Sequence, residues 1–230
     1  MNIVIPTINR KDLLLELLTN INTQLDQFDK LLIIDNGNQD IMPDINNWEL
    51  VNQNKVNIYL PGKNLGVSGS WNYGINIFRN SSHILFINDD VVIGNNQLKQ
   101  VNEFFNNNTF WLLTGNCLWS MFSISKECWD YFLQNDGYVF DENFFPAYFE
   151  DNDMHYRVQL AYETIYGQKI QYPNSFHAGA LEMDPEIFRN SMTIHKDSSL
   201  NKNFGKNEQY YIQKWGGRPG HERFRTPFEK

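Results

Sequence analysis

Two adjacent carboxylates at the end of an apolar run are the first residues whose type and placement could do chemistry. Asp89 and Asp90 follow the run 84–87, Ile-Leu-Phe-Ile, which is typical of an interior strand of a parallel sheet. A carboxylate so near a core is costly unless it is paired or binds a cation, and ligands of open α/β sheets gather at the carboxyl ends of strands. The pattern favours a site for a cation or a polar ligand, and a loop of turn-forming residues is the alternative.

The elements that must position these acids alternate between strands and helices. Residues 3–5 are strand-like and precede leucines at helical spacing, residues 31–34 and 56–60 form two more strands, and residues 66–78 form a helix. Strands at 110–114 and 121–125 and helices at 98–105 and 126–133 follow. This order predicts an α/β fold with a Rossmann-like, mixed and mainly parallel sheet that is flanked by helices in a single domain.

The start of the helix at 66–78 is rich in small residues, which let a phosphate or a ribose approach free backbone amides. A dinucleotide-binding turn is one interpretation, because the turn follows a strand and Asp89 lies about 20 residues further on. However, Gly66, Gly69 and Gly74 lack the G-x-G-x-x-G spacing of that turn. A nicotinamide oxidoreductase is therefore the less favoured of the possible functions.

The composition excludes several classes of protein. A length of 230 residues with 41% hydrophobic residues fits one domain with a substantial core. A net charge of -8 argues against a nucleic-acid partner. No apolar stretch is long enough for a transmembrane segment, so we expect a soluble protein. The two cysteines are too few for a disulfide framework, which favours reduced thiols in the cytoplasm, with a bridge between Cys117 and Cys128 as the alternative.

The sequence resembles GT-A-fold glycosyltransferases of family 2 over about its first hundred residues. The stretches that carry the resemblance, in the order found in that family, are Ile3-Val4-Ile5-Pro6-Thr7, Ile33-Ile34-Asp35-Asn36-Gly37, Asn64-x-Gly66 to Asn72-x-Gly74, and Phe86-Ile87-Asn88-Asp89-Asp90. The resemblance implies an inverting enzyme that uses a nucleotide sugar and a divalent cation.

The resemblance also implies the donor site. Asp90 occupies the metal-ligating position of the family's D-x-D element, and Asn88 replaces the first acid as a neutral hydrogen-bonding residue. Asp35 resembles the nucleobase contact, with an Asx turn as the alternative. The nucleotide-sugar-binding residues are then Pro6, Thr7, Asp35, Asn64, Gly66, Asn72, Asn88 and Asp89. Mn²⁺ or Mg²⁺ would suit Asp90, because these ions take hard oxygen ligands, and Mg²⁺ often uses one or two carboxylates with substrate phosphates.

A second acidic stretch resembles the family's catalytic motif. By that match Asp151 is the base that takes the proton of the acceptor hydroxyl, and Glu150 assists or orients the acceptor. The alternative is structural, since acids at a helix N-terminus are stabilised by the helix dipole. Asp153 and Arg157 are expected to form an i,i+4 pair with that structural role.

Histidine and tryptophan side chains add candidates. The place of His177 after the acidic motif resembles the family's histidine that reaches the metal or the diphosphate. Trp119 and Trp129 could frame an acceptor sugar, although large aromatic residues are more often core.

The C-terminal segment 206–230 is expected to be a helix and an arm. The helix is predicted at 207–215, with Asn207 as its cap and 216–217, Gly-Gly, as its end. The arm concentrates positive charge. It is either solvated or folded back over the sheet's carboxyl edge, with Arg218 or Arg225 near the diphosphate.

The sequence thus predicts one GT-A domain over residues 1–230, with a nucleotide-sugar-binding half at 1–95 and an acceptor and catalytic half at 96–205. The expected reaction is metal-dependent inverting transfer of a hexose or a deoxyhexose such as rhamnose from a UDP-sugar or another nucleoside-diphosphate sugar to a glycan hydroxyl. A catalytically idle carbohydrate-binding domain is a further alternative.

Overall fold

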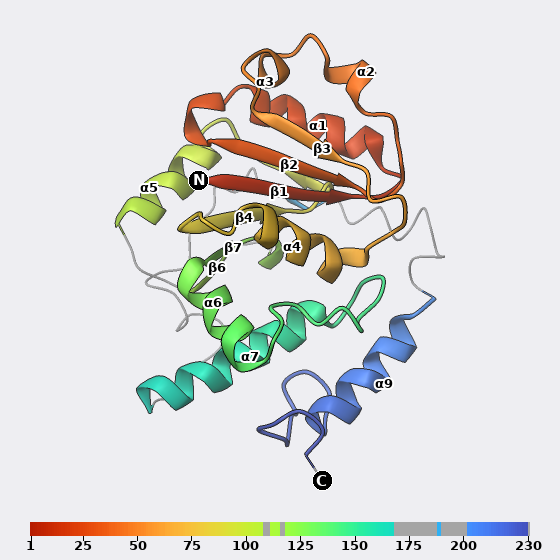
Figure 1. Ribbon diagram of the computed structural model, residues 1–230, viewed down its shortest axis with the longest axis vertical. Helices are drawn as coiled ribbons and strands as arrows, with labels where there is room; N and C mark the ends of the chain where they lie inside the picture. The colour runs from red at the N-terminus through yellow and green to blue at the C-terminus, as the bar shows by residue number, and fades with distance from the viewer. Residues whose placement is uncertain (108–110, 116–117, 168–187, 190–201, 230) are drawn as a thin grey trace.

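A six-stranded sheet forms the centre of the computed structural model, which describes residues 1–107, 111–115, 118–167, 188–189 and 202–229. The strand order is β3-β2-β1-β4-β7-β6 (Figure 1). The strands are β1 (Asn2–Thr7), β2 (Lys30–Asp35), β3 (Val56–Tyr59), β4 (His83–Ile87), β6 (Leu112–Gly115) and β7 (Leu118–Ser125). The first four are parallel, β7 runs antiparallel to β4, and β6 runs antiparallel to β7. The predicted mixed, mainly parallel sheet is confirmed.

Helices cover both faces of the sheet. Leucine and isoleucine side chains of α1 (Lys11–Asn22) and side chains of α5 (Gln97–Asn107) pack with one set of strand residues into one core. On the opposite face, α4 (Gly66–Ile77), α6 (Lys126–Asn135) and α7 (Glu150–Tyr166) form an aromatic-rich core with the alternate strand residues. Because successive strand side chains point to opposite faces, one sheet supplies both cores. The result is a three-layer α/β domain.

Close contact between α4 and β1 depends on one glycine. A Cβ atom at Gly74 would lie 2.7 Å from Val4 Cγ2, so any larger residue would force the helix away from the sheet. This contact holds α4 close against β1.

Short elements complete the domain. They are η1 (Leu25–Gln27), α2 (Met42–Ile45), α3 (Glu49–Asn52), and the strands β5 (Val91–Val92) and β8 (Phe188–Arg189), which pair antiparallel in a second sheet. Within the described part of the chain, no helix has both the length and the apolar character needed to span a membrane.

The C-terminal helix α9 (Phe204–Trp215) packs through Tyr211 and Trp215 against Phe144 and Phe149, in a third apolar cluster beyond α7 (Figure 1). The prediction that this helix starts at Asn207 is wrong. The helix starts at Phe204, so Asn207 lies inside it and is buried. Its side-chain amide does not cap the helix but donates to the carbonyl of Ala147 at 2.8 Å. The predicted end at Gly216 is confirmed, with a φ of 73° that suits glycine.

Candidate active site

A cavity of about 630 Å³ opens at the carboxyl edge of the sheet. Its walls come from the ends of β1 and β4, the start of α4, the loop before α7, one side of α7, and the C-terminal arm. The residues expected in the site that do line it are Pro6, Thr7, Asn64, Gly66, Asn88, Asp89, Asp90, Glu150 and Asp151. The volume lies within the range of about 300–1,000 Å³ typical of ligand sites. Segments far apart in the sequence therefore meet at one concave surface.

Asp89 is held at the end of β4 by the neighbouring strand. Its carboxylate accepts a hydrogen bond from Thr7 Oγ1 at 2.6 Å. Burial raises the pKa of Asp89 to about 7, and the adjacent Asp90 carboxylate contributes to this rise. The hydrogen bond from Thr7 lowers the pKa but offsets only part of the rise. Asp89 thus joins the ends of β1 and β4 with a carboxyl group that titrates near neutrality.

Asp90 is the expected metal ligand, and it is buried at the cavity wall with 8% of its surface exposed. Among the residues that the structure describes, no cluster of three or more His, Cys, Asp or Glu side chains forms a complete metal cage. A hard divalent cation still fits here, because Mg²⁺ commonly takes one or two carboxylates and completes its shell with water and substrate phosphates. His177, the second expected ligand, lies outside the described residues.

The charge of the cavity is one-sided. The carboxyl groups of Asp89, Asp90, Glu150, Asp151 and Glu222 line it, and no lysine or arginine does so within the described part of the chain. A diphosphate entering alone would meet like charges, whereas a diphosphate that arrives with a divalent cation would bring its own neutralisation. The donor set therefore fits a metal-bound diphosphate.

The glycine-rich turn before α4 is locked by internal hydrogen bonds. Gly66 N–H donates to Asn64 Oδ1 at 2.8 Å, and Val67 N–H donates to the carbonyl of Pro146 at 2.8 Å. Gly66 has a φ of 71°, and a Cβ there would lie 2.8 Å from the Pro146 oxygen. The expectation that these amides are free for a phosphate is not met at Gly66 and Val67. The glycine serves instead to let the loop before α7 approach the helix start.

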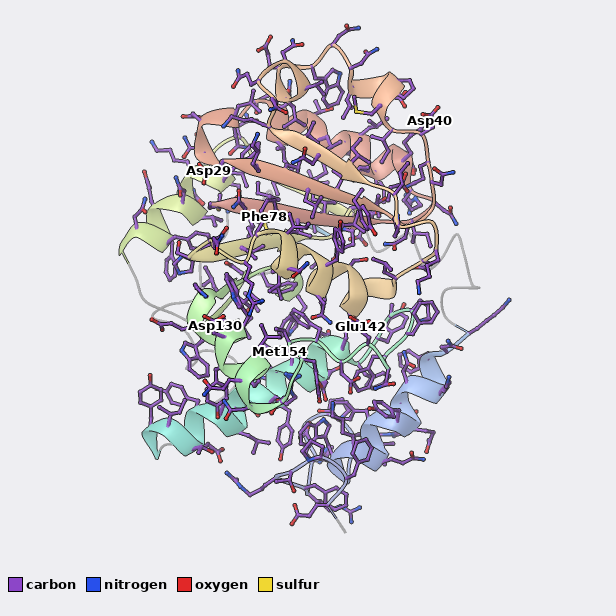
Figure 2. The ribbon with its side chains drawn as sticks, in the orientation of Figure 1. Asp29, Asp40, Phe78, Asp130, Glu142 and Met154 are labelled. Atoms are coloured by element: carbon purple, nitrogen blue, oxygen red, sulfur yellow. The ribbon has the colours of Figure 1, made fainter. Side chains whose placement is uncertain are left out.

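Two expected donor residues lie behind the cavity wall rather than on it. The buried carboxylate of Asp35 accepts from the amides of Gly37 at 3.0 Å and Gln39 at 2.5 Å, as in the alternative Asx turn. The side-chain amide of Asn72 donates to the Phe140 carbonyl at 2.8 Å and to Glu142 at 2.9 Å. Glu142, labelled in Figure 2, lies in the loop that leads to α7. Both side chains hold loops that shape the cavity.

The acids at the start of α7 follow a strained turn. Tyr148 and Phe149 have φ values of 80° and 72°, and a non-glycine residue in this region costs about 1–3 kcal/mol. Glu150 is 6% exposed, and burial, followed by the charge of Asp151, raises its pKa well above the ordinary range. Asp151 also lines the cavity and accepts from Asn152 N–H at 2.8 Å. The two adjacent acids therefore differ in environment: Glu150 is buried with a raised pKa, and Asp151 is partly exposed at the cavity wall.

Asp153 and Arg157 form the expected pair, at 3.5 Å, but within a larger buried network. Arg157 donates to the Val139 carbonyl at 2.8 and 2.7 Å, and Asp153 lies 2.7 Å from Lys214 Nζ. Asp153 also accepts from Trp215 Nε1 at 2.8 Å. This network joins α7 to α9, which gives these charges a structural role in the core.

The C-terminal arm folds back onto the cavity. Pro219, Gly220 and Glu222 line it, so the arm is not a solvated tail. The expected arginines lie elsewhere: Arg218 pairs with Glu208 at 3.0 Å, and Arg225 pairs with Glu163 at 2.8 Å. Neither guanidinium group lines the cavity, because each is held by a glutamate of α9 or α7.

The sequence interpretation missed several lining residues. His155 and Gln159 follow Asp151 at a spacing of four on α7, and this helical spacing could have identified them. Tyr211 and Glu222 had no such signal, since they reach the cavity through tertiary contacts of α9 and the arm. Of the two candidate tryptophans, Trp119 lines the cavity and Trp129 is fully buried in the core.

The model of one family, glycosyl transferase family 2, matches residues 2–138 of the sequence. This match covers more than half of the chain. The chain belongs to glycosyl transferase family 2. The alternative of a nicotinamide oxidoreductase is thereby excluded, and Asp90 at the end of β4 lies within the matched region.

Solved structures with the same fold are glycosyltransferases of low sequence identity. TarS 1-349 from S. aureus in complex with UDP has a TM-score of 0.53 and 17% identity, over 69% of this family 2 chain and 54% of that one. The mannosyltransferase PcManGT from Pyrobaculum calidifontis, in complex with GDP-Man and Mn²⁺, has a TM-score of 0.52 and 12% identity, over 70% and 52%. This family 2 chain therefore spans about half the length of the structures it matches. A comparison with curated proteins finds no match.

The family match ends before the second half of the cavity. Glu150, Asp151 and the C-terminal arm lie beyond residue 138, so the family match says nothing of them and only their place in the cavity describes them.

Proposed function

We propose that this glycosyltransferase moves a hexose, or a deoxyhexose such as rhamnose, from a UDP-sugar to a hydroxyl of a glycan, with inversion and with Mn²⁺ or Mg²⁺. The observation that carries the proposal is the shared cavity, in which Asp89 and Asp90 of the matched region meet Glu150 and Asp151 of α7. The UDP complex of TarS and the GDP-Man and Mn²⁺ complex of PcManGT support a nucleotide-sugar donor.

In this proposal, residues 1–95 hold the donor and residues 96–205 the acceptor and the catalytic acids. Asp90 and His177 would hold the cation, which would supply positive charge to neutralise the leaving diphosphate. Asp90 offers a carboxylate oxygen from the end of β4, beside the backbone of Asn88 and the carboxyl of Asp89. The cation need not be fully caged by protein, since the donor's own phosphate oxygens complete its shell.

Asp151 is the proposed base. Its carboxylate lines the cavity at the start of α7, where the acceptor hydroxyl can give up its proton as its oxygen attacks the anomeric carbon. Glu150, whose pKa is raised by burial, assists the base or orients the acceptor from the same turn of α7. Inversion is what membership of the family implies: a single base that activates the acceptor permits direct displacement.

Replacement of the proposed base tests the mechanism. In Asp151→Asn the side chain keeps its shape but cannot take a proton, so we expect transfer to fall by about 10²–10⁴-fold. Transfer is measured as UDP release from UDP-glucose and other UDP-hexoses with a panel of oligosaccharide acceptors. Binding of UDP by calorimetry is the control and should be unchanged. Undiminished transfer in the variant would remove Asp151 as the base, and donor binding without turnover on every acceptor would favour an idle carbohydrate-binding domain.

A further inference from the structure

The wall of the cavity that the C-terminal arm contributes carries a carboxylate with no role in the proposed chemistry. Glu222 lines the cavity together with Tyr211, and both lie beyond the family match, which ends at residue 138. A charged side chain that a helix and an arm bring to a ligand cavity calls for a functional explanation.

Two hydrogen bonds fix the Glu222 carboxylate. Tyr211 Oη donates to Oε1 at 2.5 Å, and the Gly220 amide donates to the same oxygen at 3.0 Å. Burial, together with the hydrogen bond to Glu222, raises the pKa of Tyr211, so its hydroxyl stays protonated and donates. Both bonds end on Oε1, and Oε2 accepts none from the described residues. This second oxygen remains available to a ligand.

The arm that carries Glu222 is anchored on both sides. The amides of Arg223 and Phe224 donate to the Trp215 carbonyl at 2.9 and 3.0 Å, which turns the chain back onto α9. The hydroxyl of Tyr156 on α7 donates to the Phe224 carbonyl at 2.8 Å, and Arg225 pairs with Glu163 of the same helix. The carboxylate is therefore presented from a fixed position and not from a frayed end.

Other residues that line the same cavity as Glu222 suit a sugar ring. Trp119 and Tyr156 offer half-buried aromatic surface, and Gln159 offers a side-chain amide. Aromatic rings provide apolar area at a low entropy cost, while carboxylate and amide groups exchange hydrogen bonds with hydroxyls. Tyr156 and Gln159 belong to α7, whose first turn holds Asp151. A sugar bound along this wall lies on the helix that carries the proposed base.

We propose that Glu222, oriented by Tyr211, is a specificity-determining residue that binds the hydroxyls of a neutral acceptor sugar and disfavours an anionic one. This inference deepens the proposed function and rests on it. The charge of the cavity sets the preference: its described lining holds five carboxyl-bearing side chains and neither lysine nor arginine, so an acceptor carboxylate or phosphate beside Glu222 would meet a like charge.

Ligand-observed NMR on the full chain loaded with UDP and Mg²⁺ tests this inference. The probes are the neutral methyl β-glycosides of glucose, galactose and N-acetylglucosamine, and the anionic methyl β-glucuronide. We expect at least one neutral glycoside to bind, and Glu222→Ala to weaken it about tenfold, the loss of one charge-assisted hydrogen bond. Glu229→Ala, which removes an exposed carboxylate of the same arm, is the matched control and should bind like the wild type.

Glu222→Gln separates recognition from mere folding of the arm. The amide keeps the shape and the hydrogen bonds but not the charge, so the preference for methyl β-glucoside over methyl β-glucuronide should shrink. Tyr211→Phe, which removes the orienting hydroxyl, should weaken neutral glycosides by a smaller factor than Glu222→Ala. Thermal melts by circular dichroism verify that each variant is folded, and Tyr211→Phe replaces Glu222→Ala if the latter is not.

The inference is overturned if no neutral glycoside binds to the wild type, if Glu222→Ala binds the glycosides as the wild type does, or if glucuronide binds as tightly as glucoside. Calorimetry with UDP and Mg²⁺, run on the same samples, reports on the proposed function separately. If UDP binding depends on the metal but glycoside binding is the same with and without Glu222, only this inference is refuted. Glycoside binding that depends on Glu222 without any UDP binding would refute only the donor assignment.

Discussion

At the scale of single residues, Asp89 and Asp90 are neighbours in the chain with different surroundings. Asp89 accepts a short hydrogen bond from Thr7, and its pKa is raised to about 7 because it is buried. Asp90 lies on the cavity wall at the turn into β5. The family resemblance already separates Asp90, the expected metal ligand, from Asp89, and the structure adds that Asp89 links the ends of two strands.

The raised pKa of Asp89 predicts a pH dependence of stability. The unfolded chain loses this proton near the ordinary pKa of 3.8, whereas the folded chain keeps it to about 7. The folded state therefore binds the proton more tightly, and the contribution of Asp89 to stability falls as pH rises through this interval. Asp89→Asn has no such proton to lose.

We therefore expect the free energy of unfolding of wild type minus that of Asp89→Asn to fall by about 2–4 kcal/mol between pH 4 and pH 8. Urea unfolding followed by circular dichroism, in EDTA so that no cation contributes, measures this difference. A difference that is flat or that rises with pH would show that Asp89 is ionised throughout.

At the scale of elements, the buried network between α7 and α9 is the feature with the largest expected effect on stability. Lys214 is 1% exposed and lies 2.7 Å from both Asp141 and Asp153. Burial alone would lower the pKa of Lys214, but the two carboxylates outweigh it and raise the pKa above its ordinary range. The lysine stays charged and compensates two buried acids.

Removal of this charge should destabilise the protein. Lys214→Met leaves Asp141 and Asp153 without their shared cation, and an uncompensated buried charge costs about 3–5 kcal/mol. Lys206→Met, an exposed lysine on the same helix, is the control and should change the free energy of unfolding by less than about 0.5 kcal/mol. Urea unfolding at pH 7 measures both. Equal effects of the two substitutions would mean that the network does not contribute to folding.

The sequence predicts those elements whose signals are local. Apolar runs identify the four parallel strands, and helical spacing identifies α1, α4 and α6, because burial imposes these periods on the chain. The start of α9 is mispredicted, since Asn207 resembles a cap but is engaged by the loop before α7. Glu222 carries no local signal at all, because only tertiary contacts of the arm bring it to the cavity.

At the scale of the whole molecule, the cavity joins a part that matches the family with a part that does not. Residues 2–138 contain the sheet and the strand-end acids, while α7, α9 and the arm close the other side. Most of the residues expected at the donor site line the cavity, because parallel strands bring their carboxyl ends to one edge, whereas Asp35 and Asn72 do not line it. We propose that residues of the matched part bind the donor and that residues of α7, α9 and the arm select the acceptor.

The central claim is a cation-dependent donor site at Asp90, and isothermal calorimetry with UDP tests it most directly. The cavity is lined by carboxyl groups without a described lysine or arginine, so UDP should bind with Mn²⁺ and lose at least about tenfold in affinity in EDTA. Asp90→Ala should abolish the Mn²⁺-dependent part without unfolding the protein, and Asp89→Ala should reduce it less. Equally tight UDP binding with Mn²⁺ and with EDTA, or a wild-type response in Asp90→Ala, would contradict the account.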